Sequence, residues 1–237
     1  MPQSPSPLRA VLFDAGYTLL EMDYGALTAQ LRARGHHRDE AAVVDAERRA
    51  RMRLEVERAA QPTAGRTGEG RYVRYVLEHL AITDEIERGA IAEWRRGFNP
   101  PIGLCHRADG EAATALQRAR EAGCVVGVIS NSNGSVRRAL EEAGLGPHLD
   151  FVIDSTEVGI AKPDPRVFAL GLEQAGTAAD QACYIGDSYF VDVVGARRAG
   201  LDAVLFDPGR VWSARDCPVA TGLSAAVEGA LNRRHSR

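Results

Sequence analysis

Long hydrophobic runs and paired cysteines are both missing from this sequence of 237 residues. The longest apolar stretch, residues 124–129, falls far short of the roughly 20 residues that a membrane-spanning helix needs. Residues 1–7 hold no apolar core of the kind found in signal peptides. The 4 cysteines contain no Cys-x-x-Cys pair, which argues against a zinc site or a disulfide framework. We therefore expect a cytoplasmic protein with reduced thiols and no membrane partner.

A strong excess of charge is also lacking. The formal net charge is −3, which gives no electrostatic reason to expect a nucleic-acid partner. Arginines cluster at residues 48–53, but residues 21–100 carry 14 acidic and 14 basic side chains in balance. The cluster is therefore predicted to lie on a solvated helix face. Hydrophobic residues make up 45% of the chain and charged residues 26%, as in an ordinary globular protein.

Lysine is nearly absent. Of the 29 basic residues, Lys162 is the single lysine and the other 28 are arginines. An ammonium group is a compact point charge, whereas a guanidinium group is a broad planar fork that cannot fill the same space. Lys162 is therefore a candidate functional residue, retained where arginine would not serve.

Short apolar runs alternate with helical segments over most of the chain. The runs predict buried strands at residues 10–13, 125–129, 151–153, 183–185 and 203–206. Helices, each followed by a glycine as a stop, are predicted at residues 111–122, 136–143, 165–175 and 191–199. This alternation predicts an α/β fold with a doubly wound parallel sheet.

Residues 21–100 differ from the rest because they contain no strand-like run. Their pattern predicts four helices, near residues 25–34, 39–60, 71–80 and 84–98. We therefore predict an α/β core formed by residues 1–20 and 101–237, with an all-helical domain inserted at residues 21–100.

Polar residues follow four of the predicted strands. In chain order they are Asp14 with Gly16 and Thr18, then Ser130 with Asn131, then Lys162 by way of a loop, then Asp187 with Asp192. Because the carboxyl ends of parallel strands meet at one edge of the sheet, these groups should converge. Clustered carboxylates suit magnesium, and ammonium and hydroxyl donors suit a phosphoryl group.

At these residues the chain resembles the haloacid dehalogenase-like (HAD) superfamily. The resemblance is carried by residues 11–19, 129–131, 161–165 and 185–192, and it extends from residue 8 to about residue 208. The helical insertion after the first motif resembles the cap of the phosphatase and phosphoglucomutase branch. The resemblance implies a Rossmann-like core and a hydrolase.

The resemblance also implies roles for the site residues. Asp14 would be the nucleophile, and Lys162 would bridge the charges of the nucleophile and the phosphate. Thr18, Ser130 and Asn131 would contact or orient the phosphorylated substrate. Magnesium would be held by Asp14, the backbone carbonyl of Gly16, Asp187 and Asp192. The implied substrate is a small phosphorylated metabolite. The sequence itself is compatible with a monomer or a homodimer.

The sequence departs from the family pattern at Gly16. The phosphatases of the family carry there a second aspartate, which protonates the leaving group and then activates water. General acid–base catalysis of this kind typically contributes about 10²–10⁴-fold. The nearest proton donor is Tyr17, and tyrosine, with an ordinary pKa near 10, is a poor substitute at neutral pH.

Three interpretations follow from this departure. In the first, the protein is a magnesium-dependent phosphatase whose substrates have good leaving groups, such as acyl phosphates. In the second, it has another chemistry of the superfamily. Dehalogenation is disfavoured because the dehalogenases lack the Gly-Asp metal motif of residues 186–187, and phosphonate cleavage because the inserted helices contain no lysine. In the third, it is a catalytically weak or inactive binding or regulatory protein on the same scaffold.

Overall fold

The computed structural model describes residues 7–60, 68–98, 103–212 and 215–232. The chain divides into two compact units, one formed by Met1–Glu21 with Cys105–Arg237 and the other by Met22–Leu104. The sequence predicts that the inserted domain begins after residue 20 and ends at residue 100. In the structure the boundaries between the two units lie after residues 21 and 104. Residues 99–102, which include the expected return point of the insertion, lie outside the described part of the chain.

The first unit is built on a six-stranded sheet of order β5-β4-β1-β6-β7-β8, in which every neighbouring pair is parallel. This confirms the predicted α/β fold with a parallel sheet. Leu12 at the centre of β1 pairs with Gly127 on one side and Tyr184 on the other. The strands are β1 Ala10–Phe13, β4 Val125–Ser130, β5 Phe151–Asp154, β6 Ala182–Gly186, β7 Asp202–Phe206 and β8 Val219–Ala220.

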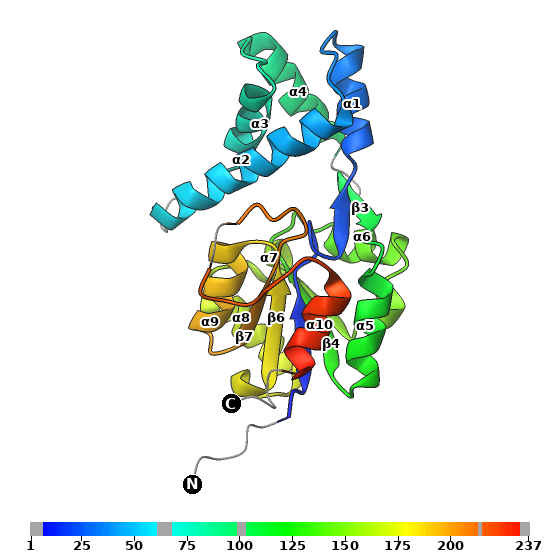
Figure 1. Ribbon diagram of the computed structural model, residues 1–237, viewed down its shortest axis with the longest axis vertical. Helices are drawn as coiled ribbons and strands as arrows, with labels where there is room; N and C mark the ends of the chain where they lie inside the picture. The colour runs from blue at the N-terminus through cyan, green and yellow to red at the C-terminus, as the bar shows by residue number, and fades with distance from the viewer. Residues whose placement is uncertain (1–6, 61–67, 99–102, 213–214, 233–237) are drawn as a thin grey trace. The chain divides into compact units, whose positions relative to one another are not determined.

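Helices cover both faces of this sheet (Figure 1). Helices α5 (Ala112–Glu121) and α10 (Leu223–Asn232) pack together on one face, and α8 (Pro165–Ala175) and α9 (Val194–Arg198) pack together on the other. Asp164 caps the start of α8 by accepting a hydrogen bond from the Arg166 amide. The shorter elements are α6 Val136–Glu142, η1 Gly146–His148, α7 Ser155–Val158, η2 Ala179–Gln181 and the π-helical turn η3 Tyr189–Val193.

The structure corrects the sequence prediction at several short elements. Strands β2 (Leu20–Met22) and β3 (Cys105–Ala108) pair as a second sheet, although no strand-like run is visible there. Both are too short and too polar to form an apolar run. The helix predicted at residues 191–199 is interrupted, because η3 precedes α9.

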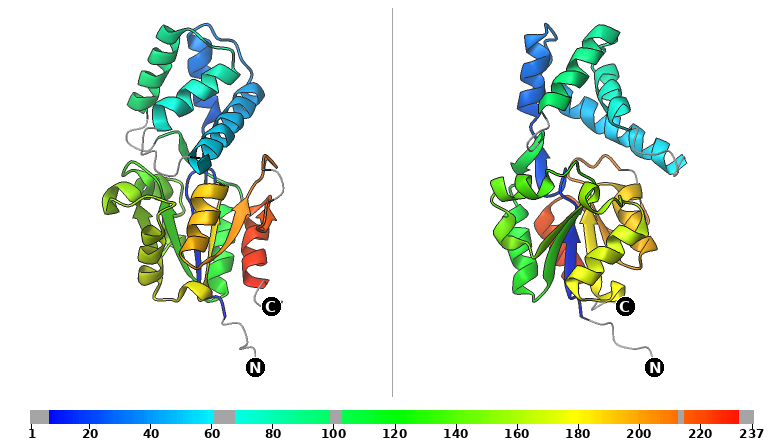
Figure 2. Two further views of the ribbon diagram at one scale, coloured as in Figure 1. Left: turned by 90° about the vertical axis from the view of Figure 1, so that its left-hand side faces the viewer. Right: turned by 180° about the vertical axis from the view of Figure 1, so that it is seen from behind.

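The second unit contains the helices α1 Tyr24–Ala33, α2 Glu40–Ala60, α3 Gly68–His79 and α4 Glu85–Phe98 (Figure 2). Helix α2 packs against α1 and α3, and α3 packs against α4. Leu31, Leu77 and Ile91 are among its buried core residues. The predicted helices are all present, and α3 begins earlier than its sequence pattern indicates.

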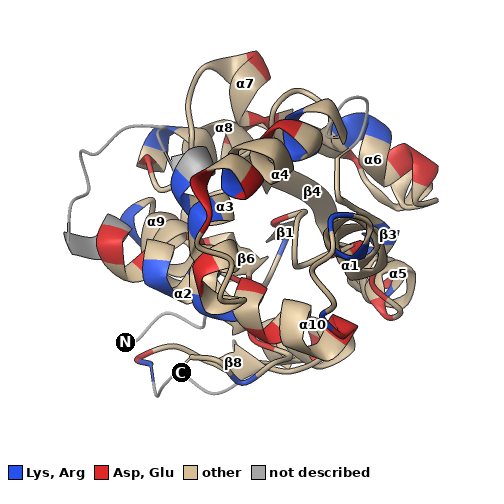
Figure 3. Ribbon diagram, turned by 90° about the horizontal axis from the view of Figure 1, so that it is seen from above, with Lys and Arg blue, Asp and Glu red and all other residues tan. Residues whose placement is uncertain are grey.

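Arginines of the cluster on helix α2 form ion pairs with acidic side chains. Basic and acidic positions alternate along this helix (Figure 3). Arg49 contacts Asp45 at 2.8 Å, one turn away on the same helix. Arg53 contacts Glu78 of helix α3 at 2.9 Å. The pairs of Arg49 and Arg53 agree with the predicted solvated face, whereas Arg51 contacts the buried Glu47 at 2.8 Å. None of the helices within the described ranges combines the length and the apolar character needed to cross a membrane.

Candidate active site

Three adjacent strands of the first unit end at the predicted site. Asp14 directly follows β1, Ser130 is the last residue of β4, and Asp187 directly follows β6. Because β4, β1 and β6 are neighbours, Asp14 occupies the middle of this row. The backbone amide of Asp14 donates to the Ile185 carbonyl at 2.9 Å, which holds the residue in line with the sheet.

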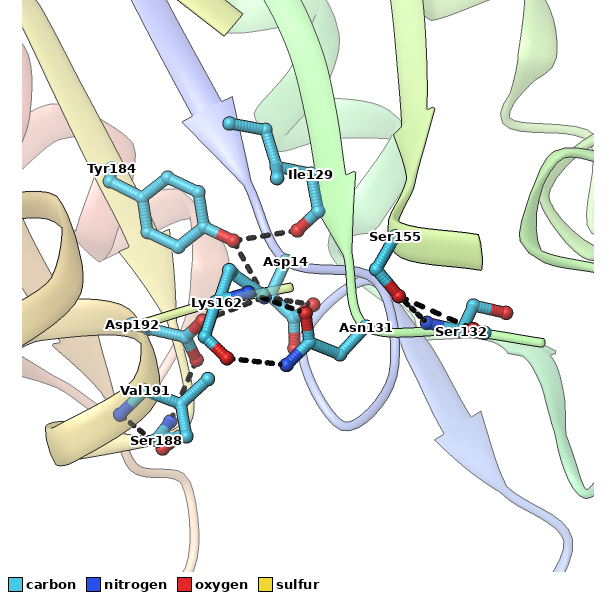
Figure 4. Close-up of polar contacts among 10 residues, drawn as sticks. All are labelled: Asp14, Ile129, Asn131, Ser132, Ser155, Lys162, Tyr184, Ser188, Val191 and Asp192. Carbon is cyan, nitrogen blue, oxygen red and sulfur yellow. Dashed lines mark hydrogen bonds and ion pairs between the residues drawn. The ribbon is translucent and has the colours of Figure 1, made fainter. Parts of the chain in front are cut away.

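The ammonium group of Lys162 lies at the centre of a buried network (Figure 4). It donates hydrogen bonds to Asp14 Oδ1 at 2.7 Å, to Asp192 Oδ1 at 2.7 Å and to the Tyr184 hydroxyl at 2.8 Å. Its side chain is only 2% exposed. An ammonium group has three N–H donors, and all of them are used here. A guanidinium group would not fit the same three oxygens, which gives a physical reason for lysine at this position.

The sequence analysis did not identify Tyr184, which lies inside the apolar run of β6. Its hydroxyl accepts a hydrogen bond from Lys162 and donates one to the Ile129 carbonyl at 2.8 Å. Burial, together with the negative charges of Asp192 and Asp14, raises its pKa well above the ordinary range. Tyr184 therefore stays neutral and serves as a fixed support for Lys162.

Asn131 holds the backbone of Lys162. Its Oδ1 accepts from the Lys162 amide at 2.8 Å, and its Nδ2 donates to the Lys162 carbonyl at 2.9 Å (Figure 4). Both ends of the side-chain amide are thus used within the protein. The geometry shows Asn131 supporting Lys162, whereas its predicted contact with substrate stays a prediction.

Asp192 anchors the network from the other side. Its Oδ1 accepts from Lys162, and its Oδ2 accepts from the backbone amide of Ser188 at 3.0 Å. Gly186 is needed for this arrangement, because a Cβ atom there would lie 2.5 Å from Asp192 Cγ. Any larger residue at this position would displace the carboxylate.

Burial dominates the electrostatics of the site. It raises the pKa of Asp14 to about 6, against the opposing effect of Lys162 and with a further upward contribution from Asp192. Burial alone would lower the pKa of Lys162, but Asp14 and Asp192 outweigh it and the net shift is upward. Lys162 is therefore a permanent cation at neutral pH.

The carboxylates fit a divalent cation. Asp14, Asp187 and Asp192 each offer an oxygen, and these oxygens lie within 4.8 Å of one another. Three carboxylates against one ammonium leave an excess of two negative charges in a largely buried space. Hard oxygen donors and this charge excess match Mg²⁺. Asp192 accepts a hydrogen bond on each of its two carboxylate oxygens, and its predicted contact with the cation stays a prediction.

The loop after β1 is held by its own backbone. The amides of Leu19 and Leu20 donate to the Ala15 carbonyl at 2.9 and 2.8 Å, and Tyr17 adopts a left-handed conformation with φ 62°. Thr18 is 1% exposed, and within the described residues its hydroxyl has no hydrogen-bond partner. This buried position fits an orienting role in the loop, and a substrate contact by Thr18 stays a prediction.

Gly16 leaves room for a larger side chain. Among the residues that the structure describes, a Cβ atom built there would meet only Cys105, at an ordinary contact distance of 3.9 Å to both Cβ and Sγ. The φ angle of Gly16 is not in the left-handed region. The backbone conformation therefore does not require glycine here, and a Cβ atom can be placed without a clash.

The comparison with protein families decides the relationship. A model of the haloacid dehalogenase-like hydrolases matches residues 8–200, which is most of the chain. The chain belongs to this family. The resemblance that was drawn from the four motifs is thereby confirmed.

Individual HAD relatives match shorter parts of the chain. The phosphoserine phosphatase of Thermus thermophilus is 42% identical over 100 residues, covering 42% of this chain and 40% of that protein. The ribulose-1,5-bisphosphate 5-phosphatase of Halopiger xanaduensis is 34% identical over 99 residues, covering 41% of each chain. The chain thus spans about 40% of the length of these curated relatives.

Solved HAD structures share the fold over nearly the whole chain. The HAD hydrolase YfnB of Bacillus subtilis, which was solved with magnesium bound, aligns with a TM-score of 0.71 at 19% identity. That alignment covers 96% of this chain and 100% of that chain. The L-2-haloacid dehalogenase of Xanthobacter autotrophicus aligns with a TM-score of 0.63 at 18% identity, covering 94% and 98%. At these identities the likeness concerns the fold alone.

Proposed function

We propose that the protein is a magnesium-dependent phosphatase that acts on a small phosphorylated metabolite through an aspartyl-phosphate intermediate. The observation that carries this proposal is the buried triangle of Asp14, Lys162 and Asp192, with Asp187 beside it. A carboxylate nucleophile, a fixed ammonium group and a charge excess suited to Mg²⁺ are the parts that phosphoryl transfer needs. The phosphatases among the relatives support the same class of substrate.

Asp14 would carry the covalent step. Its Oδ1 accepts a hydrogen bond from Lys162, and we assign the attack on phosphorus to Oδ2. The new Oδ2–P bond forms while the bond to the leaving oxygen breaks, and the departing oxyanion takes a proton from water. A second water then attacks phosphorus and releases inorganic phosphate, which regenerates the Asp14 carboxylate.

The surrounding groups would stabilise charge and position. Lys162 neutralises negative charge shared between Asp14 and the phosphoryl oxygens, and Ser130 donates to one of those oxygens. Asp14, Asp187 and the Gly16 carbonyl would hold Mg²⁺, which supplies further neutralisation of the phosphoryl charge when it is bound. Asp192 and Asn131 keep Lys162 in place.

The absence of an acid at position 16 should select the substrate. Without a positioned proton donor, the leaving group must depart as an anion, so good leaving groups are favoured. Acyl phosphates and activated esters meet this requirement. We further propose that the helical unit acts as a cap that sets substrate choice, and that the protein is cytoplasmic and a monomer or homodimer.

The test is phosphate release from a panel of aryl and alkyl phosphates and acyl phosphates, with Mg²⁺ or with EDTA. We expect turnover only with Mg²⁺, and rates that rise steeply as the leaving group becomes more acidic. Release of phosphate at equal rates in EDTA would contradict the magnesium requirement. Values of kcat/KM that do not depend on the leaving group would show that another residue supplies the proton.

A second candidate function is a binding or regulatory protein on the same scaffold. Gly16 is the observation that favours it, because the missing acid–base group lowers the expected rate. The two functions give different results in the same assay. Magnesium binding without turnover of any substrate in the panel would favour the binding protein.

A further inference from the structure

The segment after β7 is fixed by a buried aspartate. Asp207 is 3% exposed, and its Oδ1 accepts from the Val211 amide at 2.9 Å. Its Oδ2 accepts from the Trp212 amide at 3.0 Å, and the Arg210 amide donates to the Asp207 carbonyl at 3.1 Å. Because both carboxylate oxygens bind backbone amides, the turn that ends at Trp212 has a defined shape.

The indole of Trp212 is held in turn by aromatic neighbours. Its ring centroid lies 6.1 Å from that of Tyr189 and 6.3 Å from that of Phe190. The Arg215 guanidinium lies 5.0 Å from the Trp212 ring centroid. From this packed position the indole Nε1 donates a hydrogen bond to the Asp187 carbonyl at 3.0 Å.

The peptide group that joins Asp187 to Ser188 is held at both ends. The carbonyl of Asp187 and the amide of Ser188 belong to one planar peptide unit. Trp212 binds the carbonyl at 3.0 Å, and Asp192 Oδ2 accepts from the amide at 3.0 Å. The plane that follows Asp187 is thus fixed from two sides, and with it the backbone from which the Asp187 carboxylate projects.

We propose that Trp212 is a positioning residue for the cation site, acting through the Asp187 carbonyl. This inference rests on the proposed function, since it assumes that Asp187 binds Mg²⁺. Groups that hydrogen-bond to a metal-binding residue and fix its orientation typically contribute 10–100-fold to metal affinity. Loss of the indole N–H should therefore weaken Mg²⁺ binding, although Trp212 itself offers no ligand atom.

The experiment compares Mg²⁺ affinity by titration calorimetry in the wild type, Trp212→Phe and Tyr189→Phe. Tyr189→Phe is the matched control, because it keeps a ring in the same cluster and loses only a hydroxyl bond to the exposed Asp216. We expect Trp212→Phe to bind Mg²⁺ about 10-fold or more weakly, and Tyr189→Phe to match the wild type. Equal affinity in Trp212→Phe and the wild type would overturn the inference, as would an equal loss in both variants.

A second variant covers the case in which Trp212→Phe is unfolded, as judged by circular dichroism. Asp207→Asn keeps the indole but disturbs the bonds to the amides of Val211 and Trp212, so a smaller loss of Mg²⁺ affinity is expected. Unchanged affinity in Asp207→Asn would count against the inference.

Magnesium binding by the wild type without turnover would contradict the proposed phosphatase and leave the role of Trp212 standing. A wild type that binds no Mg²⁺ would overturn both.

Discussion

The Asp14→Asn protein is expected to release no phosphate above background while remaining folded. Asparagine has the size of aspartate, but its amide cannot form the acyl phosphate. Loss of a covalent nucleophile costs on the order of 10⁴-fold or more in other enzymes. The measurement is phosphate release with Mg²⁺ from the best substrate of the panel.

The folded state of this variant should be at least as stable as the wild type. Burial raises the pKa of Asp14 from 3.8 to about 6, so the folded protein binds the proton more tightly than the unfolded chain. Above that pH the buried carboxylate therefore lowers the stability of the fold, and a neutral amide removes this cost. Thermal unfolding at pH 7 in EDTA should give a Tm equal to or above that of the wild type.

The matched control is Asp180→Asn. Asp180 is exposed and lies in η2, directly before β6, at the opposite end of the strand from Asp187. Full activity is expected in this variant. Turnover by Asp14→Asn near the wild-type rate, in a preparation free of the wild type, would exclude Asp14 as the nucleophile.

Gly16→Asp is expected to raise the rate on alkyl phosphates by about 10²–10⁴-fold, the usual contribution of a general acid. Acyl phosphates should gain little in kcat/KM, which reports transfer of the phosphoryl group to Asp14, because their leaving groups need no proton. The Cβ atom of the new side chain meets no clash, since it would lie 3.9 Å from Cys105. The measurement is the dependence of kcat/KM on the pKa of the leaving group, which should become much flatter in the variant.

Gly16→Asn separates proton transfer from the effect of added bulk. It has the same shape as Gly16→Asp but carries no titratable proton, so its profile should stay as steep as that of the wild type. A gain of equal size in both variants would mean that bulk, not acid catalysis, limits the natural protein. No gain in either would show that position 16 is not the place from which the leaving group is protonated.

The sequence predicts the core of this fold because its central strands are continuous apolar runs. Strands β1, β4 and β6 are buried on both faces, and the polar residues that end them are visible for that reason. Strands β2 (Leu20–Met22) and β3 (Cys105–Ala108) pair with each other in a separate sheet. Neither contains a continuous apolar run, so the sequence pattern does not predict them.

The sequence predicts the site residues that follow strands. It does not predict the residues that lie in the core and hold the site residues in place. Lys162 stood out as the single lysine, and Asp14 and Asp192 are the carboxylates that it contacts. Tyr184 reads as an ordinary core residue, since nothing in its neighbours indicates that its hydroxyl reaches Lys162. Trp212 lies 25 residues beyond Asp187, and only the tertiary fold brings its indole to that carbonyl.

The proposed mechanism requires that a phosphoryl group is transferred to Asp14. The wild type should be mixed with acetyl phosphate and Mg²⁺, quenched in acid within one turnover, and reduced with borohydride, which converts an acyl phosphate to an alcohol. Peptide mass spectrometry should then find the modified residue at Asp14 and nowhere else. Turnover with an unmodified Asp14, or modification of a different carboxylate, would contradict the mechanism.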